Sequence, residues 1–249
     1  MKFSVLASGS KGNCTFIETE KTKILIDLGM SSLYIEKKLW TLGINPNEID
    51  GILITHTHVD HVAGLKVFLK KYNSKVYLTN KMYNELKDII NNYCIIESDI
   101  LIKDLNVKVF KTSHDSSDSV GFILECNSHE LVYITDTGYI NSKNHKLLKN
   151  KNGYIIESNH DVEMLMNNKS YPHHIKIRIL GDKGHLSNID SANYMNQFVG
   201  NNTKQVVLIH LSENNNTKDL AYQTMRNILD SNINITISSQ NEETELLEV

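Results

Sequence analysis

The sequence predicts an α/β protein in which layers of β-sheet are covered by helices, folded as a single domain over residues 1–249. Segments with the two-residue period of strands alternate with helical segments in both halves of the chain. The composition, with 40% hydrophobic and 22% charged residues, is typical of a globular protein with a full core. No internal repeat and no proline-rich linker marks a second domain.

The first half supplies a regular succession of strands and helices. The first helix has Ser31 or Ser32 as its expected N-terminal cap, and Gly43 follows its end. A polar turn at Glu20 and Lys21 separates the second and third strands. The predicted strands cover 2–8, 13–20, 22–29, 51–55 and 75–79, and the predicted helices cover 31–43, 63–73 and 81–92.

The second half begins with three consecutive strands, and helices dominate after them. Residues 126–130 form the expected hairpin turn between two of these strands. Asparagine-rich stretches at 167–169 and 214–218 are predicted loops, and the acidic tail at 241–249 is a predicted solvated end. The predicted strands cover 105–112, 120–126, 130–138, 205–209 and 233–238, and the predicted helices cover 144–150, 161–168, 188–199 and 220–230.

Several classes of protein are disfavoured by composition. No apolar run approaches the roughly 20 residues of a membrane helix, and the start MKFSVLASGS alternates like a strand instead of resembling a signal peptide. Cys14, Cys94 and Cys126 are odd in number and far apart, so no disulfide framework or thiolate zinc site is encoded. We therefore expect a cytoplasmic protein without membrane contact, and no protein partner can be inferred. The net charge of −3 gives no general attraction to phosphate.

The stretch GILITHTHVDHVAG, residues 51–64, carries the strongest chemical signal. An apolar strand leads into His56 and His58, whose side chains point the same way in extended backbone, and then into Asp60 and His61 at the start of a helix. Four donors this close would repel one another and compete for hydrogen bonds unless a cation collected them. A histidine patch without metal is the weaker alternative, so the spacing predicts a metal site.

Three other apolar runs end in a donor at the same relative place: His114, Asp136 and His210. If those strands share a sheet edge, the donors converge with the first cluster. Each alone could be a structural histidine or a turn-forming aspartate, but together they suit two divalent metals. Zinc is favoured, and manganese or iron would accept the same donors. We expect one metal on His56, His58 and His114, the other on Asp60, His61 and His210, with Asp136 between them and an open position for a bridging hydroxide.

The order HxHxDH, His, Asp, His resembles the metallo-β-lactamase-fold hydrolase superfamily over nearly the whole chain. The resemblance implies a four-layer αββα sandwich with a two-metal site between the sheets. His61, not an arginine, follows Asp60, and no cysteine stands at a ligand position, which differs from the secreted lactam-cleaving zinc enzymes. A role in antibiotic resistance is therefore not expected.

Three further segments, ASGSKGNCT, IIESNHD and DKGHLSNIDSA, resemble the YycJ/WalJ-like branch, whose members include DNA exonucleases. The resemblance implies a metal-dependent phosphodiester hydrolase, a 5′ to 3′ DNA exonuclease with the metal-bridging hydroxide as nucleophile. It also implies that Asp60, Glu157 and His185 are catalytic. Glu157 and His185 are similar to a pair in tRNA 3′-processing nucleases, in which Glu157 would orient His185 to protonate the leaving group. The alternative is that both are surface residues beside helices.

Two regions are candidates for holding substrate phosphate. The loop from Gly9 to Asn13 lacks P-loop spacing, and it either forms a tight turn or also places Lys11 and Asn13 beside phosphate. The segment between residues 169 and 183 is basic, and the planar guanidinium of Arg178 suits a phosphate. Its cations are Lys169, Lys176, Arg178 and Lys183, against the single acidic residue Asp182. The alternative for this second region is a solvated charged strand.

The same seven metal donors would also serve a glyoxalase II-like thioester hydrolase, which is the alternative function. A metal-binding regulatory protein without catalysis is a further rival, disfavoured by the intact ligand set. The segment between Asp136 and His210 is too short for the large cap domain that the resemblance associates with RNA-processing enzymes. DNA is therefore the favoured nucleic-acid substrate over RNA.

Overall fold

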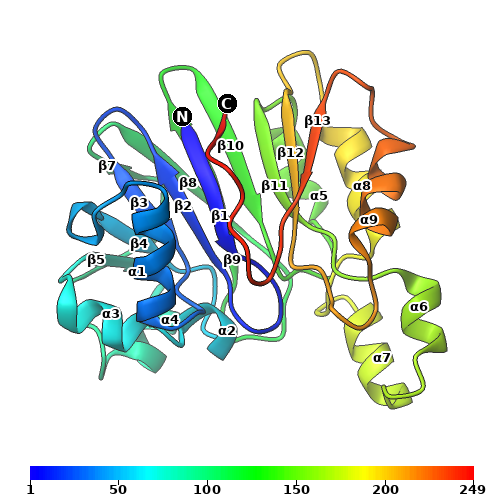
Figure 1. Ribbon diagram of the computed structural model, residues 1–249, viewed down its shortest axis with the longest axis horizontal. Helices are drawn as coiled ribbons and strands as arrows, with labels where there is room; N and C mark the ends of the chain where they lie inside the picture. Colours follow the sequence, from blue (N-terminus) through cyan, green and yellow to red (C-terminus); the bar gives the residue numbers. More distant parts are fainter.

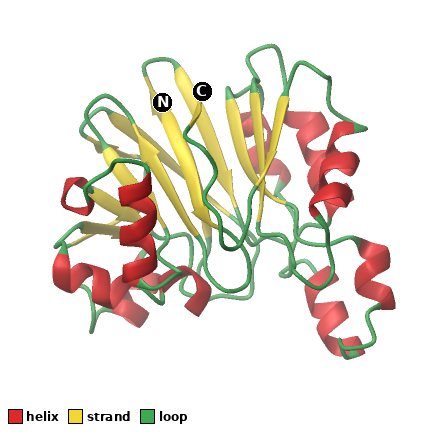
Figure 2. Ribbon diagram, in the orientation of Figure 1, coloured by secondary structure: helices red, strands yellow, loops and turns green.

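The computed structural model describes residues 1–249 and has four layers. Two seven-stranded sheets face each other in the centre, and helices cover the outer face of each sheet (Figures 1 and 2). The predicted αββα architecture is thereby confirmed. Both termini lie at the same end of the sandwich, where the amino group of Met1 donates to the carbonyl of Val249 at 3.1 Å.

The first sheet is built mainly from the N-terminal half, with mixed parallel and antiparallel pairing. Helices α1, α3 and α4 lie on its outer face, on the left of Figure 1. Its strands are, in spatial order, β14 (Leu247–Glu248), β1 (Lys2–Ala7), β2 (Cys14–Glu18), β3 (Lys23–Ile26), β4 (Gly51–Leu53), β5 (Lys75–Leu78) and β6 (Tyr93–Ile95). The helices of this half are α1 (Ser32–Thr41), α2 (Val59–Val62), α3 (Leu65–Lys71) and α4 (Asn80–Leu86), with a 3₁₀ turn at Pro46–Glu48.

The second sheet comes from the rest of the chain, and helices α5, α8 and α9 cover its outer face. Helices α6 and α7 extend beyond the sandwich at the lower right of Figure 1. The strands are, in spatial order, β13 (Asn234–Ile237), β12 (Gln205–Ile209), β11 (Gly153–Glu157), β10 (His129–Ile134), β9 (Val120–Cys126), β8 (Leu105–Lys111) and β7 (Ile100–Ile102). The helices are α5 (Ser142–Leu148), α6 (Val162–Asn167), α7 (His173–Leu180), α8 (Asn188–Phe198) and α9 (Lys218–Arg226).

Alternation along the strands divides the interior into two apolar clusters. In β10, Leu131 and Tyr133 belong to a cluster of 39 buried residues that includes the space between the sheets. Val132 and Ile134 belong to a second cluster of 18 buried residues beneath the outer helices. Because the strand is buried on both faces, its sequence is a continuous apolar run instead of a polar–apolar alternation.

The acidic tail differs from the prediction of a solvated end. Leu247–Glu248 pairs antiparallel with β1, the backbone NH of Thr244 donates to the carbonyl of Val5 at 3.0 Å, and Val249 is buried. Strand β1 would otherwise present an unpaired edge, and the tail covers it.

The basic segment near residue 178 is a helix, not the solvated charged strand that was its alternative interpretation. It forms helix α7 after Pro172, which sits at the N-terminal cap position. Strands β6, β7, β11 and β14 were not among the predicted elements either. No helix in the structure is long and apolar enough to cross a membrane.

Candidate metal centre and active site

The seven predicted metal ligands lie together at one edge of the sandwich. Helix α2, which carries Asp60 and His61, lies at the bottom of Figure 1, at the end opposite the two termini. Strand β4 leads into His56, β8 into His114, β10 into Asp136 and β12 into His210. The parallel register of β11 and β12 pairs Glu157 with Ile209, so the carboxylate of Glu157 lies next to His210. The sheet topology thus gathers donors that are far apart in the sequence.

Three histidines form the first group of donors. One ring nitrogen from each of His56, His58 and His114 lies within 4.8 Å of the others. His58 Nδ1 and His114 Nε2 are 3.2 Å apart, and the ring centroids of His56 and His58 are 4.8 Å apart. This spacing lets three imidazoles face one ion.

Asp60, His61 and His210 form the second group, in which one ligand atom from each residue also lies within 4.8 Å of the others. Asp60 Oδ2 lies 3.5 Å from His61 Nε2 and 3.7 Å from His210 Nε2. Asp136 lies between the two groups: its Oδ2 is 3.4 Å from His56 Nε2 and 2.7 Å from His61 Nε2. The carboxylate of Asp136 can therefore contact both groups.

The donor atoms fit metal ions because several of them have no hydrogen-bond partner. His56 Nε2, His210 Nε2 and both carboxylate oxygens of Asp136 are buried and make no hydrogen bond, although charged neighbours are close. Buried polar atoms are normally paired, and unpaired ones cost stability. A pair of cations would give these buried, converging atoms the partners that they lack.

The electrostatics of the cluster also require positive charge. Burial lowers the pKa of His56 well below its usual value, and the charge of His61 lowers it further, which favours a neutral imidazole ligand. The pKa of Asp136 is held well below its usual value because His210 and His61 outweigh the opposing effect of burial. Protons on histidine or divalent metals can supply that charge.

Asp27 was not identified from the sequence, yet it positions His61. The side chain is fully buried, and its Oδ2 accepts a hydrogen bond from His61 Nδ1 at 2.7 Å. Thr55 donates to the same carboxylate through its backbone NH at 2.8 Å and its hydroxyl at 2.7 Å. This arrangement fixes the tautomer of His61 and directs Nε2 toward Asp136. The signal in the sequence is an apolar strand that ends in a carboxylate, the pattern that also identified Asp136.

Strained backbone marks the same ends of strands. Asp27, Asp136 and His210 have φ angles of 60°, 48° and 57°. Left-handed backbone is uncommon outside glycine and persists where the surrounding structure holds it. Each of these residues directs its side chain into the cluster from such a turn.

Glu157 and His185 form a hydrogen-bonded pair beside the cluster. Glu157 Oε1 lies 2.6 Å from His185 Nδ1 and 3.1 Å from His210 Nδ1, and its Oε2 accepts from the backbone NH of Thr137 at 3.0 Å. Glu157 is fully buried, which contradicts the alternative of a surface residue. The His185 side chain keeps 21% of its surface exposed.

Burial disfavours the ionised form of both Glu157 and His185, but their mutual attraction outweighs it. The His185 charge and hydrogen bonds outweigh burial and lower the pKa of Glu157 to about 2. The Glu157 charge likewise outweighs burial and raises the pKa of His185 to about 9. An ionised Glu157 can therefore hold a protonated His185 at neutral pH.

The two candidate phosphate-binding regions differ in accessibility. Asn13 is 2% exposed, and its amide donates to the carbonyls of Gly9 at 3.1 Å and Asp60 at 3.3 Å. Lys11 is exposed and pairs with Glu213 at 2.8 Å. In the structure Asn13 braces the segment that carries the first ligands, and Lys11 lies at the surface; their contact with substrate stays a prediction.

Arg178 lies on α7 at the rim of the cluster. Its Nη2 is 2.5 Å from Asp115 Oδ2, and Asp115 in turn lies 3.4 Å from His114 through its other oxygen. The basic patch is smaller than the sequence indicated, because Lys176 is buried and donates to the carbonyl of Met166 at 2.6 Å.

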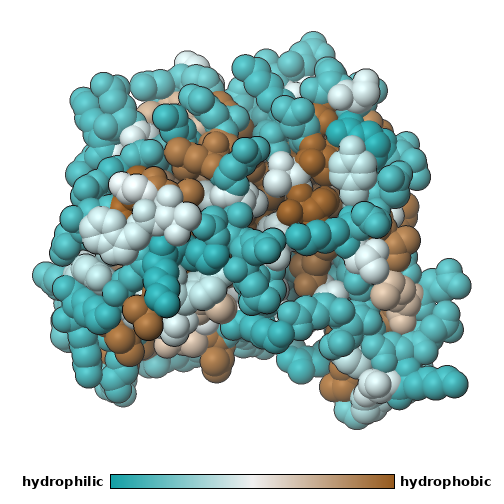
Figure 3. All heavy atoms as spheres, viewed as in Figure 1, coloured by the Kyte–Doolittle hydropathy of each residue, from teal (hydrophilic) through white to brown (hydrophobic).

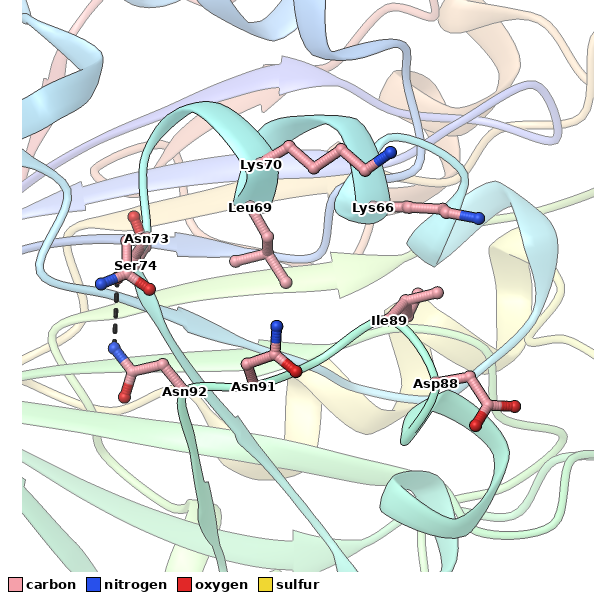
Figure 4. Close-up of a pocket in the computed structure, with 9 residues that line it drawn as sticks. All are labelled: Lys66, Leu69, Lys70, Asn73, Ser74, Asp88, Ile89, Asn91 and Asn92. Atoms are coloured by element: carbon pink, nitrogen blue, oxygen red, sulfur yellow. Dashed lines mark hydrogen bonds between the residues drawn. The ribbon is translucent and has the colours of Figure 1, made fainter.

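A separate pocket lies between α3 and the segment that follows α4, and none of the predicted site residues lines it (Figure 4). The side chain of Asn92 donates there to the carbonyl of Asn73 at 3.1 Å. The face of the molecule in Figure 3 is mostly hydrophilic, with small separate hydrophobic areas, so it offers no extended apolar binding surface. The lining of the pocket consists of Lys66, Leu69, Lys70, Asn73, Ser74, Asp88, Ile89, Asn91 and Asn92.

Comparison with known proteins agrees with this fold. Residues 7–91 match the family model described as the metallo-beta-lactamase superfamily. The metallo-beta-lactamase fold protein YhfI from Bacillus subtilis has a similar structure, with a TM-score of 0.74 at 13% identity over 98% of this chain and 99% of that one. Zinc-bound PqqB from Methylobacterium extorquens gives a TM-score of 0.70 at 13% identity over 98% and 100% of the two chains. The fold and the donor clusters define a metal-dependent hydrolase.

Two curated relatives identify the branch. The chain is 38% identical to "Exodeoxyribonuclease YycJ" of Bacillus anthracis over 237 residues, 92% of this chain and 89% of that protein. It is also 38% identical to "Exodeoxyribonuclease WalJ" of Streptococcus pneumoniae over 240 residues, 92% of this chain and 88% of that protein. The chain therefore belongs to the YycJ/WalJ family of the metallo-beta-lactamase superfamily.

Proposed function

We propose that the protein is an exodeoxyribonuclease that hydrolyses DNA phosphodiester bonds with two divalent metal ions, zinc being favoured. The names of the two curated relatives support DNA as substrate. The observation that carries the chemistry is the Glu157–His185 pair beside the metal ligands. The 5′ to 3′ direction rests on the sequence resemblance alone.

The donor groups suggest which residues would hold each ion. His56, His58 and His114 would hold one, Asp60, His61 and His210 the other, and Asp136 would contact both. Bound divalent cations supply Lewis-acid activation of water and neutralise charge on the phosphate. Asp60 is catalytic in this scheme through its place among the ligands.

His185 would act as the general acid. Its Nδ1 is engaged by Glu157, which leaves Nε2 free to protonate the departing oxygen. The raised pKa keeps the ring protonated at neutral pH, and metal cations on Asp136 would oppose part of that shift. Glu157 holds the ring in place and stabilises its charge.

Arg178 would bind substrate phosphate at the rim. Because Asp115 already neutralises the guanidinium, phosphate binding would require Arg178 to exchange one anionic partner for another. The net gain is expected to be smaller than for an unpaired arginine.

One assay tests this function. Metal-loaded protein is incubated with 5′-labelled and 3′-labelled single-stranded DNA, duplex DNA and RNA, with a thioester as a control. Progressive release of nucleotides from DNA, abolished by a chelator, is the expected result. Hydrolysis of the thioester without action on DNA would instead indicate a glyoxalase II-like enzyme.

A further inference from the structure

A hollow of about 550 Å³ lies between the end of β8 and the start of α5, on the outer side of the second sheet. Lys111, Ser113, Tyr139, Lys143 and Asn144 are among the residues that line it. We call this hollow the Tyr139 groove. A hydrogen bond joins its two walls: the Asn144 side chain on α5 donates to the carbonyl of Lys111 at the end of β8 at 3.2 Å.

The groove adjoins the metal ligands. Ser113 directly precedes His114, and Tyr139 follows Asp136 by three positions. The two connections are joined, because the backbone NH of Gly138 donates to the carbonyl of Ser113 at 2.9 Å and Thr137 Oγ1 accepts from the NH of Ser113 at 3.0 Å. The groove is therefore built on the two connections that carry His114 and Asp136.

A basic face continues from the groove along α5. Lys143, Lys146 and Lys149 are exposed, and none of them takes part in an ion pair of the structure. Residues 137–152 contain no Asp or Glu. Lys111, which also lines the groove, is paired with Asp118 at 2.5 Å. The three free ammonium groups favour an anionic polymer.

Tyr139 supplies a flat surface inside the groove. Tyr139 is 39% exposed, its ring stacks on no other aromatic residue, and its hydroxyl makes no hydrogen bond. An exposed, unpartnered ring beside unpaired lysines is the combination by which proteins hold single-stranded nucleic acid, with bases on the aromatic face and phosphates on the cations.

We propose that the Tyr139 groove and the basic face bind the single-stranded part of the DNA that extends from the bond being cleaved. This inference rests on the proposed nuclease function and adds a binding subsite to it. Tyr139 stacks a base, Lys143 contacts a phosphate, and Lys146 and Lys149 attract the strand farther from the metal ligands. The length of strand bound on one side of the cleaved bond is set by this surface.

The test compares kcat/KM across substrates of increasing length for Tyr139→Leu, Tyr139→Phe and Lys143→Glu. The substrates are bis(4-nitrophenyl) phosphate, a dinucleotide and a single strand of about 20 nucleotides, since stacking and phosphate contacts accumulate along the strand. The matched control is Lys37→Glu, which makes the same charge change at an exposed position of α1 on the opposite face. Metal content and melting temperature are measured for every variant.

Tyr139→Leu is expected to lower kcat/KM about tenfold on the long strand, the value of roughly one stacked base, with a smaller loss on shorter substrates. Tyr139→Phe should retain most of the activity because it keeps the ring. Lys143→Glu should lower activity on the long strand and reduce the salt dependence by about one ion. Lys37→Glu should behave as the parent protein.

Losses that are equal for all three substrates, or absent on the long strand, would overturn the subsite while the nuclease function stands. A parent protein that cleaves none of the DNA substrates would overturn both. If Tyr139→Leu fails to fold, photo-cross-linking decides. A strand that carries 5-iododeoxyuridine, bound to the metal-loaded His185→Ala protein so that it is cleaved slowly, should label the peptide that contains Tyr139, and labelling only elsewhere would refute the subsite.

Discussion

The two sheets contribute to the active site in different ways. The first sheet supplies four predicted ligands within six consecutive positions, His56 to His61, and braces them with Asp27 and Asn13. The second sheet supplies one side chain at a time from the ends of β8, β10, β11 and β12. The first half of the site is therefore a local motif, whereas the second half exists only when the strands are in register. Changes in the two halves should have different consequences.

The largest effect is expected at Asp136, where the two halves meet. Asp136→Ala removes the carboxylate that lies 2.7 Å from His61 and 2.8 Å from His210. The metals would lose their shared ligand, so we predict loss of the pair by elemental analysis and activity below detection. Wild-type metal content in this variant would contradict the role of Asp136.

His185→Ala tests the second half without replacing any of the seven predicted ligands, although His185 Nδ1 lies 3.3 Å from Asp136 Oδ1. Metal content and fold should be retained, and turnover on an ordinary phosphodiester should fall about 10²- to 10⁴-fold because a positioned acid is lost. A substrate with a nitrophenolate leaving group, which needs no proton, should lose far less. Equal losses on both substrates would show that His185 binds substrate, and loss of metal would show that it is a ligand.

Asp27→Asn tests whether the hydrogen bond from His61 to Asp27 supports the first half of the site. The substitution keeps the shape but removes the carboxylate charge that orients His61. We predict a metal affinity about 10 to 100 times weaker, as is usual when a partner of a ligand is changed. Excess metal should restore activity. Activity that stays low at saturating metal would assign Asp27 a more direct role.

Arg178→Ala should have a smaller effect, because its guanidinium is already paired with Asp115. Affinity for DNA should fall a few-fold, and the salt slope should decrease by about one ion at constant metal content. Unaltered affinity and slope would make Arg178 a surface residue that only pairs with Asp115.

The smallest effect is expected at the far end of the sandwich, where Asp104 joins the two sheets. Its carboxylate accepts from Thr19 Oγ1 at 2.6 Å and from Thr22 Oγ1 at 2.5 Å. Burial raises the pKa of Asp104, but these hydrogen bonds outweigh it, so the net pKa lies below its usual value. A lowered folded pKa gives stability that is present above the unfolded pKa of about 3.9 and is lost as the pH falls through the folded value.

Asp104→Asn should therefore lower the melting temperature slightly at pH 7, and the difference from the parent protein should shrink below about pH 4. Activity per folded molecule should not change, because Asp104 lies away from the metal ligands. A melting-temperature difference that grows as the pH falls below about 4 would contradict a lowered pKa of Asp104 in the folded protein.

The contrast between the halves also explains what the sequence could predict. HxHxDH is visible because its donors are adjacent. The strand and helix patterns predict sheet layers covered by helices, and the family resemblance added the four-layer αββα order. Asp27 was overlooked because a single carboxylate after a strand has no local partner; its histidine is 34 positions away. Glu157 and His185 lie 28 positions apart, and only a family resemblance linked them. The C-terminal edge strand was missed because its pairing with β1 spans the whole chain.

Elemental analysis of the zinc-loaded wild-type protein, after removal of free metal, tests most directly whether the two halves form one two-metal site. Two zinc ions per chain are predicted, because each donor group can hold one ion and Asp136 can contact both. One zinc ion per chain, or none, would contradict the two-metal site.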